Sequence, residues 1–331
     1  MTFDYSILTI SKCRNLLMGY AILGVLIGHI ISFGGIEGTG ATNVLSWICG
    51  LVHTAGFLFL SGFGVCYSLH KNGSIMAFYQ RRLYRFLLPF FMMAIPFFML
   101  VCYVNGYGIL KYLSYISTAE FWVNGNYHGM WYIAVSLLLY IITPPICKIS
   151  AKLNVSELVR DVSLVCMSIL VCYGVKTVSA DYYELVSIGL TPLPMFYVGF
   201  LLGDLSQRQV GHQTKAMLLL FGVVALFHFL DIQVYGVGYI SHRLFGILLV
   251  CFMFGVIIDC KINPVLAIFN WLGKYTFELY ILHIYYWFVI KGIHPDGAMF
   301  NIVAAVVLSL LTCAPVHWVI GKVESKIKSL I

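Results

Sequence analysis

The 331-residue sequence predicts an all-α fold, a polytopic membrane helical bundle of about ten transmembrane helices. Hydrophobic residues make up 61% of the chain and charged residues only 10%, against roughly 25% charged residues in an ordinary soluble domain. The mean hydropathy is +0.92. Apolar runs of about 20 residues recur along the chain, and this length fits membrane-spanning helices rather than the shorter strands of a β-barrel.

Breaks between the apolar runs set the order of the predicted spans. The spans lie near residues 16–34, 44–69, 83–104, 131–150, 162–178, 185–205, 216–234, 237–258, 264–290 and 298–320. Because proline removes a helical hydrogen bond, we expect several of these helices to be kinked or broken. The prolines concerned are Pro89, Pro96, Pro144, Pro145, Pro192 and Pro194. We expect no appended soluble domain, so that residues 1–331 form a single transmembrane domain.

Lysine and arginine orient the bundle. An even number of spans places both termini on one side of the membrane. With the termini inside, the inner segments carry fifteen Lys and Arg residues and the outer segments carry four. By the positive-inside rule, this asymmetry predicts that both termini are cytoplasmic. It also accounts for the net charge of +7 without a nucleic acid partner.

The ten cysteines do not predict a disulfide framework, because most of them lie inside apolar runs, where they pack as small hydrophobic side chains. No Cys-x-x-Cys pair suggests a metal site. We therefore expect no bound metal.

The first apolar run, Leu16–Ile31, contains one ionisable side chain, His29. Arg14 lies 15 residues earlier, which corresponds to about 22 Å of helical rise. This distance places Arg14 at the cytoplasmic face and His29 in the outer half of the bilayer. His53 enters the second span from the outside and is expected at a similar depth. Each histidine could simply make a hydrogen bond between helices, but two at one depth also suit a reactive site.

A basic segment precedes the third span. It contains Arg81, Arg82 and Arg85, and the spacing of Arg82 and Arg85 puts them on one face of an α-helix. Such a segment is typical of an ordinary cytoplasmic anchor. Alternatively, its guanidinium groups could bind the phosphates of a donor such as coenzyme A.

Two further segments carry polar groups at membrane depth or beside it. Glu278 and His283 lie within the ninth span, where Glu278 could be protonated, pair with Lys274 one turn earlier, or contact a substrate. Residues 105–130, on the outer side, alternate aromatic and polar side chains and lead into Trp131-Tyr132. This loop fits an interfacial aromatic belt, or else a lid over an outward-facing cavity.

Several of these motifs, taken in order, resemble acyltransferase family 3, a family of bacterial membrane O-acyltransferases. The first span with its Gly28-His29 is similar to the opening helix of the family. The stretch from His53 to Phe63 resembles the family's His-Met-Pro-hydrophobic-Ser-Gly-Phe motif, with Met and Pro replaced. Later landmarks are Arg82-x-x-Arg85 with Pro89, Trp131-Tyr132, Tyr197-x-Gly199 and Tyr280-x-x-His283.

The chain departs from the family at one position. The family carries Arg or Lys eleven residues before the catalytic histidine, and here that position is Met18. Arg14 lies one helical turn earlier and could substitute for it.

The resemblance implies a role for each candidate residue. The implied catalytic residues are His29 as general base, His53 and Glu278. Those implied to bind the cofactor, acyl-CoA, are Arg82, Arg85, Arg14 and Arg81. Those implied to contact the substrate are Trp131, Tyr132 and His283. His53, Glu278 and His283 would orient His29 or the acceptor.

The implied activity is transfer of an acyl group, which we take as acetyl while succinyl stays open, from cytoplasmic acyl-CoA (acetyl-CoA in this interpretation) to a hydroxyl of a carbohydrate or lipid-linked glycan. The implied location is the bacterial cytoplasmic (inner) membrane, in contact with membrane lipid; the oligomeric state stays open. A transient acyl-histidine is a competing mechanism. A competing function is a proton-coupled transporter of a lipid-linked sugar or small anion, because intramembrane His and Glu residues with broken helices also suit a carrier.

Overall fold

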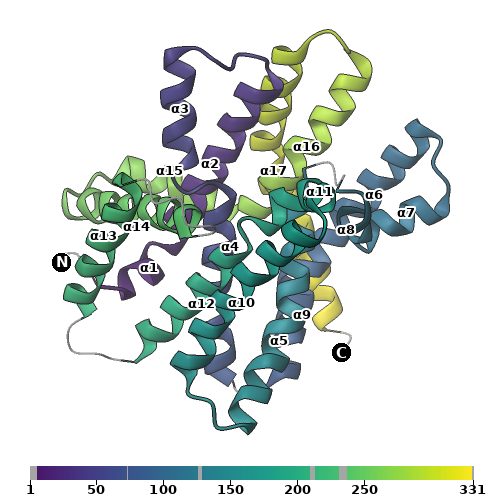
Figure 1. Cartoon of the computed structure of the whole chain (residues 1–331). Helices are drawn as coiled ribbons and strands as arrows, with labels where there is room; N and C mark the ends of the chain where they lie inside the picture. Colours follow the sequence, from purple (N-terminus) through teal and green to yellow (C-terminus); the bar gives the residue numbers. More distant parts are fainter. Residues whose placement is uncertain (1–5, 73, 126–128, 209–212, 231–236, 330–331) are drawn as a thin grey trace.

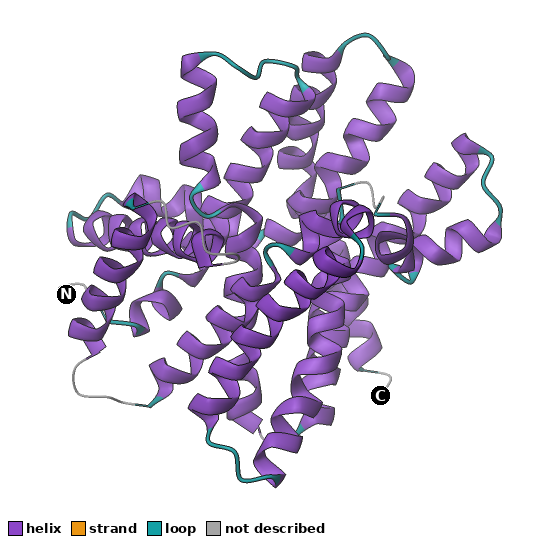
Figure 2. Ribbon diagram, in the orientation of Figure 1, coloured by secondary structure: helices purple, strands orange, loops and turns teal. Residues whose placement is uncertain are grey.

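The computed structural model describes residues 6–72, 74–125, 129–208, 213–230 and 237–329, and the regular elements in these segments are all helices (Figures 1 and 2). In chain order they are α1 (Leu8–Lys12), α2 (Arg14–Phe33), α3 (Gly40–Gly50), α4 (His53–Asn72), α5 (Ile75–Arg82), the π-helical segment η1 (Leu83–Leu87), α6 (Leu88–Asn105), α7 (Ile109–Ile116), α8 (Ala119–Asn124), α9 (Trp131–Lys152), α10 (Glu157–Val178), α11 (Ala180–Leu190), α12 (Leu193–Gln207), α13 (Gln213–Phe229), α14 (Val237–Asp259), α15 (Asn263–Lys274), α16 (Thr276–Ile293) and α17 (Ala298–Lys328).

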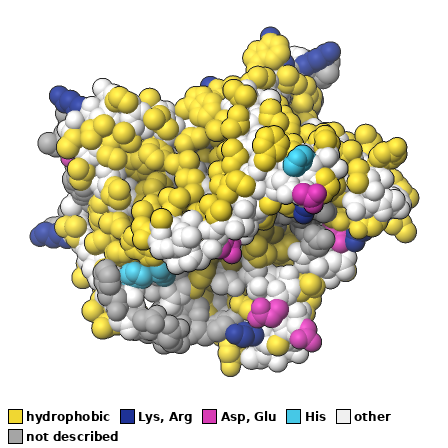
Figure 3. All heavy atoms as spheres, turned by 90° about the horizontal axis from the view of Figure 1, so that it is seen from above, with side chains coloured by type: hydrophobic (Ala, Val, Ile, Leu, Met, Phe, Trp, Pro, Cys, Tyr) yellow, Lys and Arg dark blue, Asp and Glu magenta, His cyan; other side chains and the backbone are white. Residues whose placement is uncertain are grey.

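The described residues contain eight helical segments that are long and apolar enough to cross a membrane, so the protein is a polytopic helical membrane protein. These segments are Arg14–Phe33, Gly40–Lys71, Ile75–Asn105, Trp131–Lys152, Glu157–Val178, Ala180–Gln207, Gly238–Asp259 and Ala298–Lys328. Figure 3 shows hydrophobic side chains over much of the face seen from above, with scattered charged side chains and histidines among them.

The two remaining predicted spans take a different form. The span near 216–234 corresponds to α13, whose apolar part, Met217–His228, is shorter than the other spans; residues 231–234 lie outside the described residues. The span near 264–290 is divided between α15 and α16 at Tyr275. The cytoplasmic placement of both termini stays a prediction.

Three of the predicted spans are pairs of half-helices. The breaks fall at Leu51–Val52 between α3 and α4, at Thr191–Pro192 between α11 and α12, and at Tyr275. Pro192 accounts for the second break, because proline lacks the N–H that would continue the helical ladder. At the third break, the Oγ1 of Thr276 lies 3.0 Å from the carbonyl oxygens of Leu272 and Gly273, which the broken helix leaves without a helical partner.

The other prolines have less effect on continuity than the sequence suggests. Pro89 lies just after the π-helical segment η1, and the helical chain continues past it as α6. Pro96, Pro144 and Pro145 lie inside helices that continue past them.

Close backbone contact fixes α4 against α12. A Cβ atom at Gly62 would come within 1.8 Å of the Phe196 carbonyl oxygen, and one at Gly199 within 1.9 Å of the Phe59 carbonyl oxygen. Only glycine permits this approach, which resembles the small-residue packing of membrane helices. The tightly packed pair α4–α12 therefore supports the residues at the N-terminal ends of these two helices, where His53 and Pro192 lie.

Candidate active site

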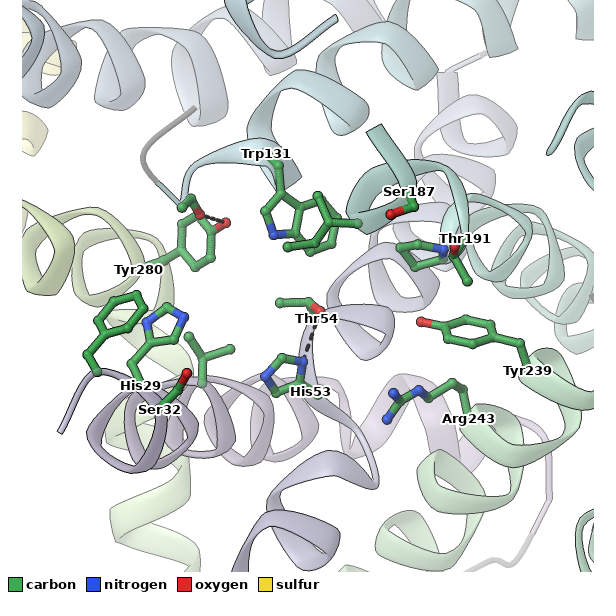
Figure 4. A pocket seen from close by; sticks show the side chains of 15 residues that line it. His29, Ser32, His53, Thr54, Trp131, Ser187, Thr191, Tyr239, Arg243 and Tyr280 are labelled. Carbon is green, nitrogen blue, oxygen red and sulfur yellow. Dashed lines mark hydrogen bonds between the residues drawn. The ribbon is translucent and has the colours of Figure 1, made fainter. Parts of the chain in front are cut away.

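A cavity of about 500 Å³ lies where two of the helix breaks meet (Figure 4). The residues at the α3–α4 break and the α11–α12 break contribute to its wall, together with α2, α9, α14 and α16. Its lining residues are Val25, His29, Ser32, Phe33, His53, Thr54, Gly129, Trp131, Ser187, Ile188, Thr191, Pro192, Tyr239, Arg243 and Tyr280. Histidine, hydroxyl, phenol and guanidinium groups thus share one concave site within an apolar bundle, which is the usual setting of a ligand site.

His29 and His283 form a hydrogen-bonded pair whose proton positions follow from a third group. The Nδ1 of His283 lies 2.7 Å from the Leu279 carbonyl oxygen, and a carbonyl only accepts, so this Nδ1 carries the proton. The Nε2 of His283 is then an acceptor, and the Nδ1 of His29 donates to it across 2.8 Å. His29 is left with an unprotonated Nε2. Its ring is also held by Phe33, stacked at a centroid distance of 4.6 Å.

His283 itself is fully buried and does not line the cavity. The resemblance implied that His283 orients His29 or contacts the substrate. In the structure its Nε2 lies 2.8 Å from the Nδ1 of His29.

His53 lies at the first residue of α4 with a φ of 39°, a left-handed conformation that is uncommon for any residue other than glycine. Its Nδ1 is 3.0 Å from the hydroxyl of Thr54. It is close enough to His29 for the two rings to interact electrostatically. Strained residues of this kind cluster at functional sites, where the surrounding structure holds them in place.

Arg243 enters the cavity from α14 and supports the first helix break. Its guanidinium donates to the carbonyl of Gly50, the last residue of α3, and lies over the ring of Tyr239 at 5.2 Å. Its buried Nε has no hydrogen-bond partner among the described residues. An intramembrane arginine that is only partly satisfied suits a bound group that accepts hydrogen bonds.

Trp131 and Tyr132, at the start of α9, occupy different positions. Trp131 lines the cavity. Tyr132 packs behind it, against the ring of Tyr280 at 5.7 Å. Tyr280 in turn lines the cavity and donates from its hydroxyl to the Gly129 carbonyl at 2.6 Å. Only Trp131 of the predicted pair therefore faces the cavity directly.

Glu278 is not part of this cavity. Its Oε1 lies 2.7 Å from the Nδ1 of His317 on α17, and Lys274, the partner considered from the sequence, lies over the ring of Tyr275 instead. The pair Glu278–His317 fastens α16 to α17. Glu278 lies on α16, the helix that also carries His283. Any effect of Glu278 on His29 is therefore indirect and passes through the position of α16.

The arginines gather at a second site. The charge of Arg14 interacts with the charges of Arg82 and Arg85 and with the phenols of Tyr132 and Tyr140. Arg82 lies over the ring of Tyr140, 4.4 Å from its centroid. Within the described part of the chain, no carboxylate pairs with Arg14, Arg82 or Arg85. We call these three residues the arginine cluster.

Arg81 is separate from this cluster, because its Nε donates to the Ser68 hydroxyl at 3.2 Å and its guanidinium also reaches the Ser68 carbonyl at 3.0 Å. The next residues, Leu83–Leu87, form the π-helical segment η1, so Arg82 and Arg85 are not related by a regular α-helical turn as the sequence suggested. Single π-helical turns inside α-helices are frequent at functional sites.

The loop between α6 and α9 is built around a buried carboxylate. Residues 105–125 fold into α7 and α8, and the nearly buried Glu120 accepts hydrogen bonds from Lys111, Ser114 and Asn124. Burial alone would raise the pKa of Glu120, but these hydrogen bonds outweigh it and hold the pKa below its ordinary value. Residues 126–128 of the predicted outer loop 105–130, among them His128, lie outside the described residues.

Sequence reasoning did not select Arg243, Tyr239, Thr54, Ser187 or Thr191 as site residues. Arg243 carried a usable signal, since it is an arginine inside a predicted span. The hydroxyl-bearing residues carried none, because serine, threonine and tyrosine are common in membrane helices.

The fold and the two sites together define a multi-pass membrane protein with a histidine-lined cavity inside its helical bundle. Residues 15–318 match the family model described as an acyltransferase domain, so the chain belongs to acyltransferase family 3 and is a membrane acyltransferase. Arg14 lies one residue before the matched segment. No match was found among curated proteins or among solved structures.

Proposed function

We propose that this acyltransferase moves an acetyl group from cytoplasmic acetyl-CoA to a hydroxyl of a carbohydrate or lipid-linked glycan. The observation that carries the proposal is which ring nitrogens of the His29–His283 pair carry a proton. This arrangement leaves the Nε2 of His29 as an unprotonated base in a cavity that also holds a guanidinium group. We also propose the bacterial cytoplasmic membrane as its location, with the arginine cluster on the cytoplasmic side.

In the proposed reaction, the acceptor hydroxyl oxygen attacks the carbonyl carbon of the thioester while the Nε2 of His29 takes the hydroxyl proton. A carbon–oxygen bond forms, and the carbon–sulfur bond then breaks. The proton on His29 passes to the departing thiolate, which gives the acetyl ester and free coenzyme A. His283 supports the transient imidazolium by accepting from its Nδ1.

The neighbouring residues supply charge and orientation. Arg243 would stabilise the negative charge on the attacked carbonyl oxygen, since its Nε lacks a partner in the described part of the chain. His53 would orient the acceptor or His29, and Trp131 would contact the acceptor from the cavity wall. Glu278 acts as a positioning residue through its pair with His317.

The arginine cluster supports the choice of donor. Three like charges close together are unfavourable unless an anion compensates them. The phosphates of acetyl-CoA carry such charge, and guanidinium groups bind phosphate in bidentate fashion. Arg81 is less suited to this role, because Ser68 already occupies its guanidinium.

Tyr132 and Tyr280 connect the two sites. Tyr132 interacts with the charge of Arg14, and it packs on Tyr280, which lines the histidine cavity. In our proposal, the pantetheine arm passes beside these rings and presents the thioester to His29.

The test is glycan mass spectrometry on cells that carry the wild-type gene, His29→Ala or no gene. We expect an acyl mass increment with the wild type and a decrease of about 10² to 10⁴ in the acylated fraction for His29→Ala, the range that general-base catalysis supplies. His294→Ala, at a histidine outside the cavity, is the matched control and keeps the increment. Full acylation by His29→Ala would exclude His29 as the base.

A single-turnover experiment separates general-base catalysis from an acyl-histidine intermediate. Purified protein is mixed with radiolabelled acetyl-CoA in the absence of acceptor and digested. We expect no label on the peptide that contains His29. A stable adduct there would replace the general-base step with a covalent one.

A further inference from the structure

An apolar groove of about 380 Å³ runs between α9 and α10, with α11 and α12 as its floor. Its lining residues are Trp122, Leu138, Leu139, Ile142, Ile146, Leu164, Met167, Ser168, Val171, Val175, Tyr182, Val186, Leu190, Leu193 and Tyr197. The residues of α10 that line it extend from Leu164 to Val175, which corresponds to about 16 Å along the helix. The groove is therefore long and narrow, and it follows the direction of the helices.

The walls of the groove offer hydrocarbon contacts. Ser168 donates its hydroxyl proton to the Val165 carbonyl at 2.6 Å, so its polar atom is already satisfied. At one end, the hydroxyl of Tyr182 donates to the Trp122 carbonyl at 2.7 Å. Trp and Tyr side chains are typical of the level at which lipid headgroups meet the membrane core. The groove thus begins at an aromatic end and continues between aliphatic side chains.

The groove opens towards the membrane. Among the eight membrane-spanning segments in the described residues, α10 is the least buried. Only 22% of the residues in its 18-residue apolar stretch are buried inside the protein. Met167 and Val171, which line the groove, are 55% and 47% exposed. At this position on a membrane-spanning helix the surrounding medium is hydrocarbon, so the occupant with matching chemistry is a lipid chain.

The turn between α11 and α12 separates the groove from the histidine cavity. Thr191 and Pro192, in this turn, and Ser187, one helical turn earlier, line the cavity that contains His29. Leu190 and Leu193, on either side of the turn, line the groove. One short segment therefore has a polar side towards the candidate catalytic base and an apolar side towards the groove.

We propose that the groove holds the hydrocarbon chain of the acceptor, so that the acceptor is a lipid-linked glycan rather than a free sugar. This inference rests on the proposed function, since the sugar of such a lipid would reach the cavity around the α11–α12 turn. The chain in the groove would hold the lipid beside His29 and lower the entropic cost of placing the hydroxyl.

The test fills the groove from the membrane side. Val171→Trp places a large ring into it, and Leu170→Trp, at the next residue of α10, is the matched control: Leu170 is 58% exposed and does not line the groove. Native mass spectrometry is applied to wild type and both variants, released from bacterial membranes into detergent. We expect a lipid with a glycan headgroup bound to the wild type and Leu170→Trp, and at least a tenfold lower occupancy in Val171→Trp.

A second measurement uses the same membranes with radiolabelled acetyl-CoA and follows the label into organic-extractable lipid. We expect Val171→Trp to lower this labelling about tenfold relative to Leu170→Trp. Equal lipid retention by the two variants, or retention of ordinary phospholipid alone, would overturn the inference. So would label that enters only water-soluble glycan, although the proposed function would then stand. Glycolipid bound in the groove without any acetyl transfer would support the groove and overturn the proposed function.

Discussion

Arg208 and the arginine cluster have opposite electrostatic surroundings. Arg208 donates hydrogen bonds to two carboxylates. Its Nε lies 2.7 Å from an oxygen of Asp204, and another of its guanidinium nitrogens lies 3.3 Å from an oxygen of Glu157. The Nε2 of His70 lies 3.3 Å from Asp204 and 3.6 Å from Glu157. We call these four residues the paired cluster. In the arginine cluster, by contrast, no described carboxylate compensates the positive charges.

The difference separates two uses of the same side chain. In the paired cluster, charge is balanced within the protein, and the contacts join α4, α10 and α12. In the arginine cluster the balance is missing, and Arg14 and Arg85 are exposed. An external anion would restore the balance there, so we expect one cluster to support folding and the other to support binding.

The strongest test of this comparison is the double substitution Arg82→Ala with Arg85→Ala. We expect the affinity for acetyl-CoA to fall about 100-fold, since each hydrogen bond to a charged group contributes on the order of 1.5 kcal/mol. Isothermal titration of the purified protein measures the affinity. Arg208→Ala, in the paired cluster, is the control and keeps the wild-type affinity; unchanged affinity in the double variant would contradict the assignment.

The converse test removes a carboxylate from the paired cluster. Asp204 is 1% exposed, and Asp204→Asn leaves Glu157 as the one described carboxylate within reach of Arg208 and His70. We expect a destabilisation on the order of 2 kcal/mol, visible as a lower thermal midpoint in detergent, with no change in acetyl-CoA affinity.

A surface pair provides the control for that experiment. Lys328 and Glu324 form an ion pair one turn apart on α17, and both are partly exposed. Because such pairs contribute little, Glu324→Gln should change the stability by less than about 0.5 kcal/mol. A loss as large as that of Asp204→Asn would mean that the paired cluster has no special role.

Ionic strength should also separate the clusters. Raising the salt concentration from about 0.1 M to 1 M shortens the Debye length from about 10 Å to 3 Å. We expect acetyl-CoA binding at the exposed arginine cluster to weaken by roughly tenfold, while the thermal midpoint changes little. A thermal midpoint that falls together with affinity would argue against the distinction.

The smallest expected effect concerns a third charge pair, Lys111–Glu120, in the loop between α6 and α9. The pKa of Glu120 is lowered in the folded protein, so its contribution to stability is present above the ordinary carboxyl pKa of about 4.3 and is lost as pH falls through the lowered value. Lys111→Ala removes one of the donors that lower this pKa, so the loss of stability in acid should be smaller and should be complete at a higher pH than in the wild type. Hydrogen exchange of residues 109–124 at pH 3 to 6 measures it, and a pH dependence identical to that of the wild type would disprove the coupling.

The fold class could be predicted from composition, because the apolar runs alone require membrane helices. The sequence also singled out His29, His53, Arg82 and Arg85, since ionisable groups are conspicuous among apolar neighbours. That His29 and His53 line one cavity agrees with the similar depth expected for them.

The helix breaks and the partners of buried groups could not be predicted in the same way. No proline marks the break at Leu51–Val52; the carbonyl of Gly50 is instead satisfied by Arg243, 193 residues further along the chain. The partner of Glu278 is His317 on another helix rather than the lysine one turn away. Such long-range contacts depend on the tertiary arrangement, which local spacing does not encode.

The π-helical segment η1 makes the arginine cluster sensitive to the number of residues as well as to their identity. A single deletion at Leu83 would allow the chain from α5 to α6 to continue as a regular α-helix and would rotate α5 by about 100° relative to α6. Arg82 would then leave the ring of Tyr140 although every arginine is still present. Titration with acetyl-CoA compares this deletion with Leu83→Ala, which keeps the chain length. A lower affinity in the deletion alone would show that the helical register set by η1 controls donor binding.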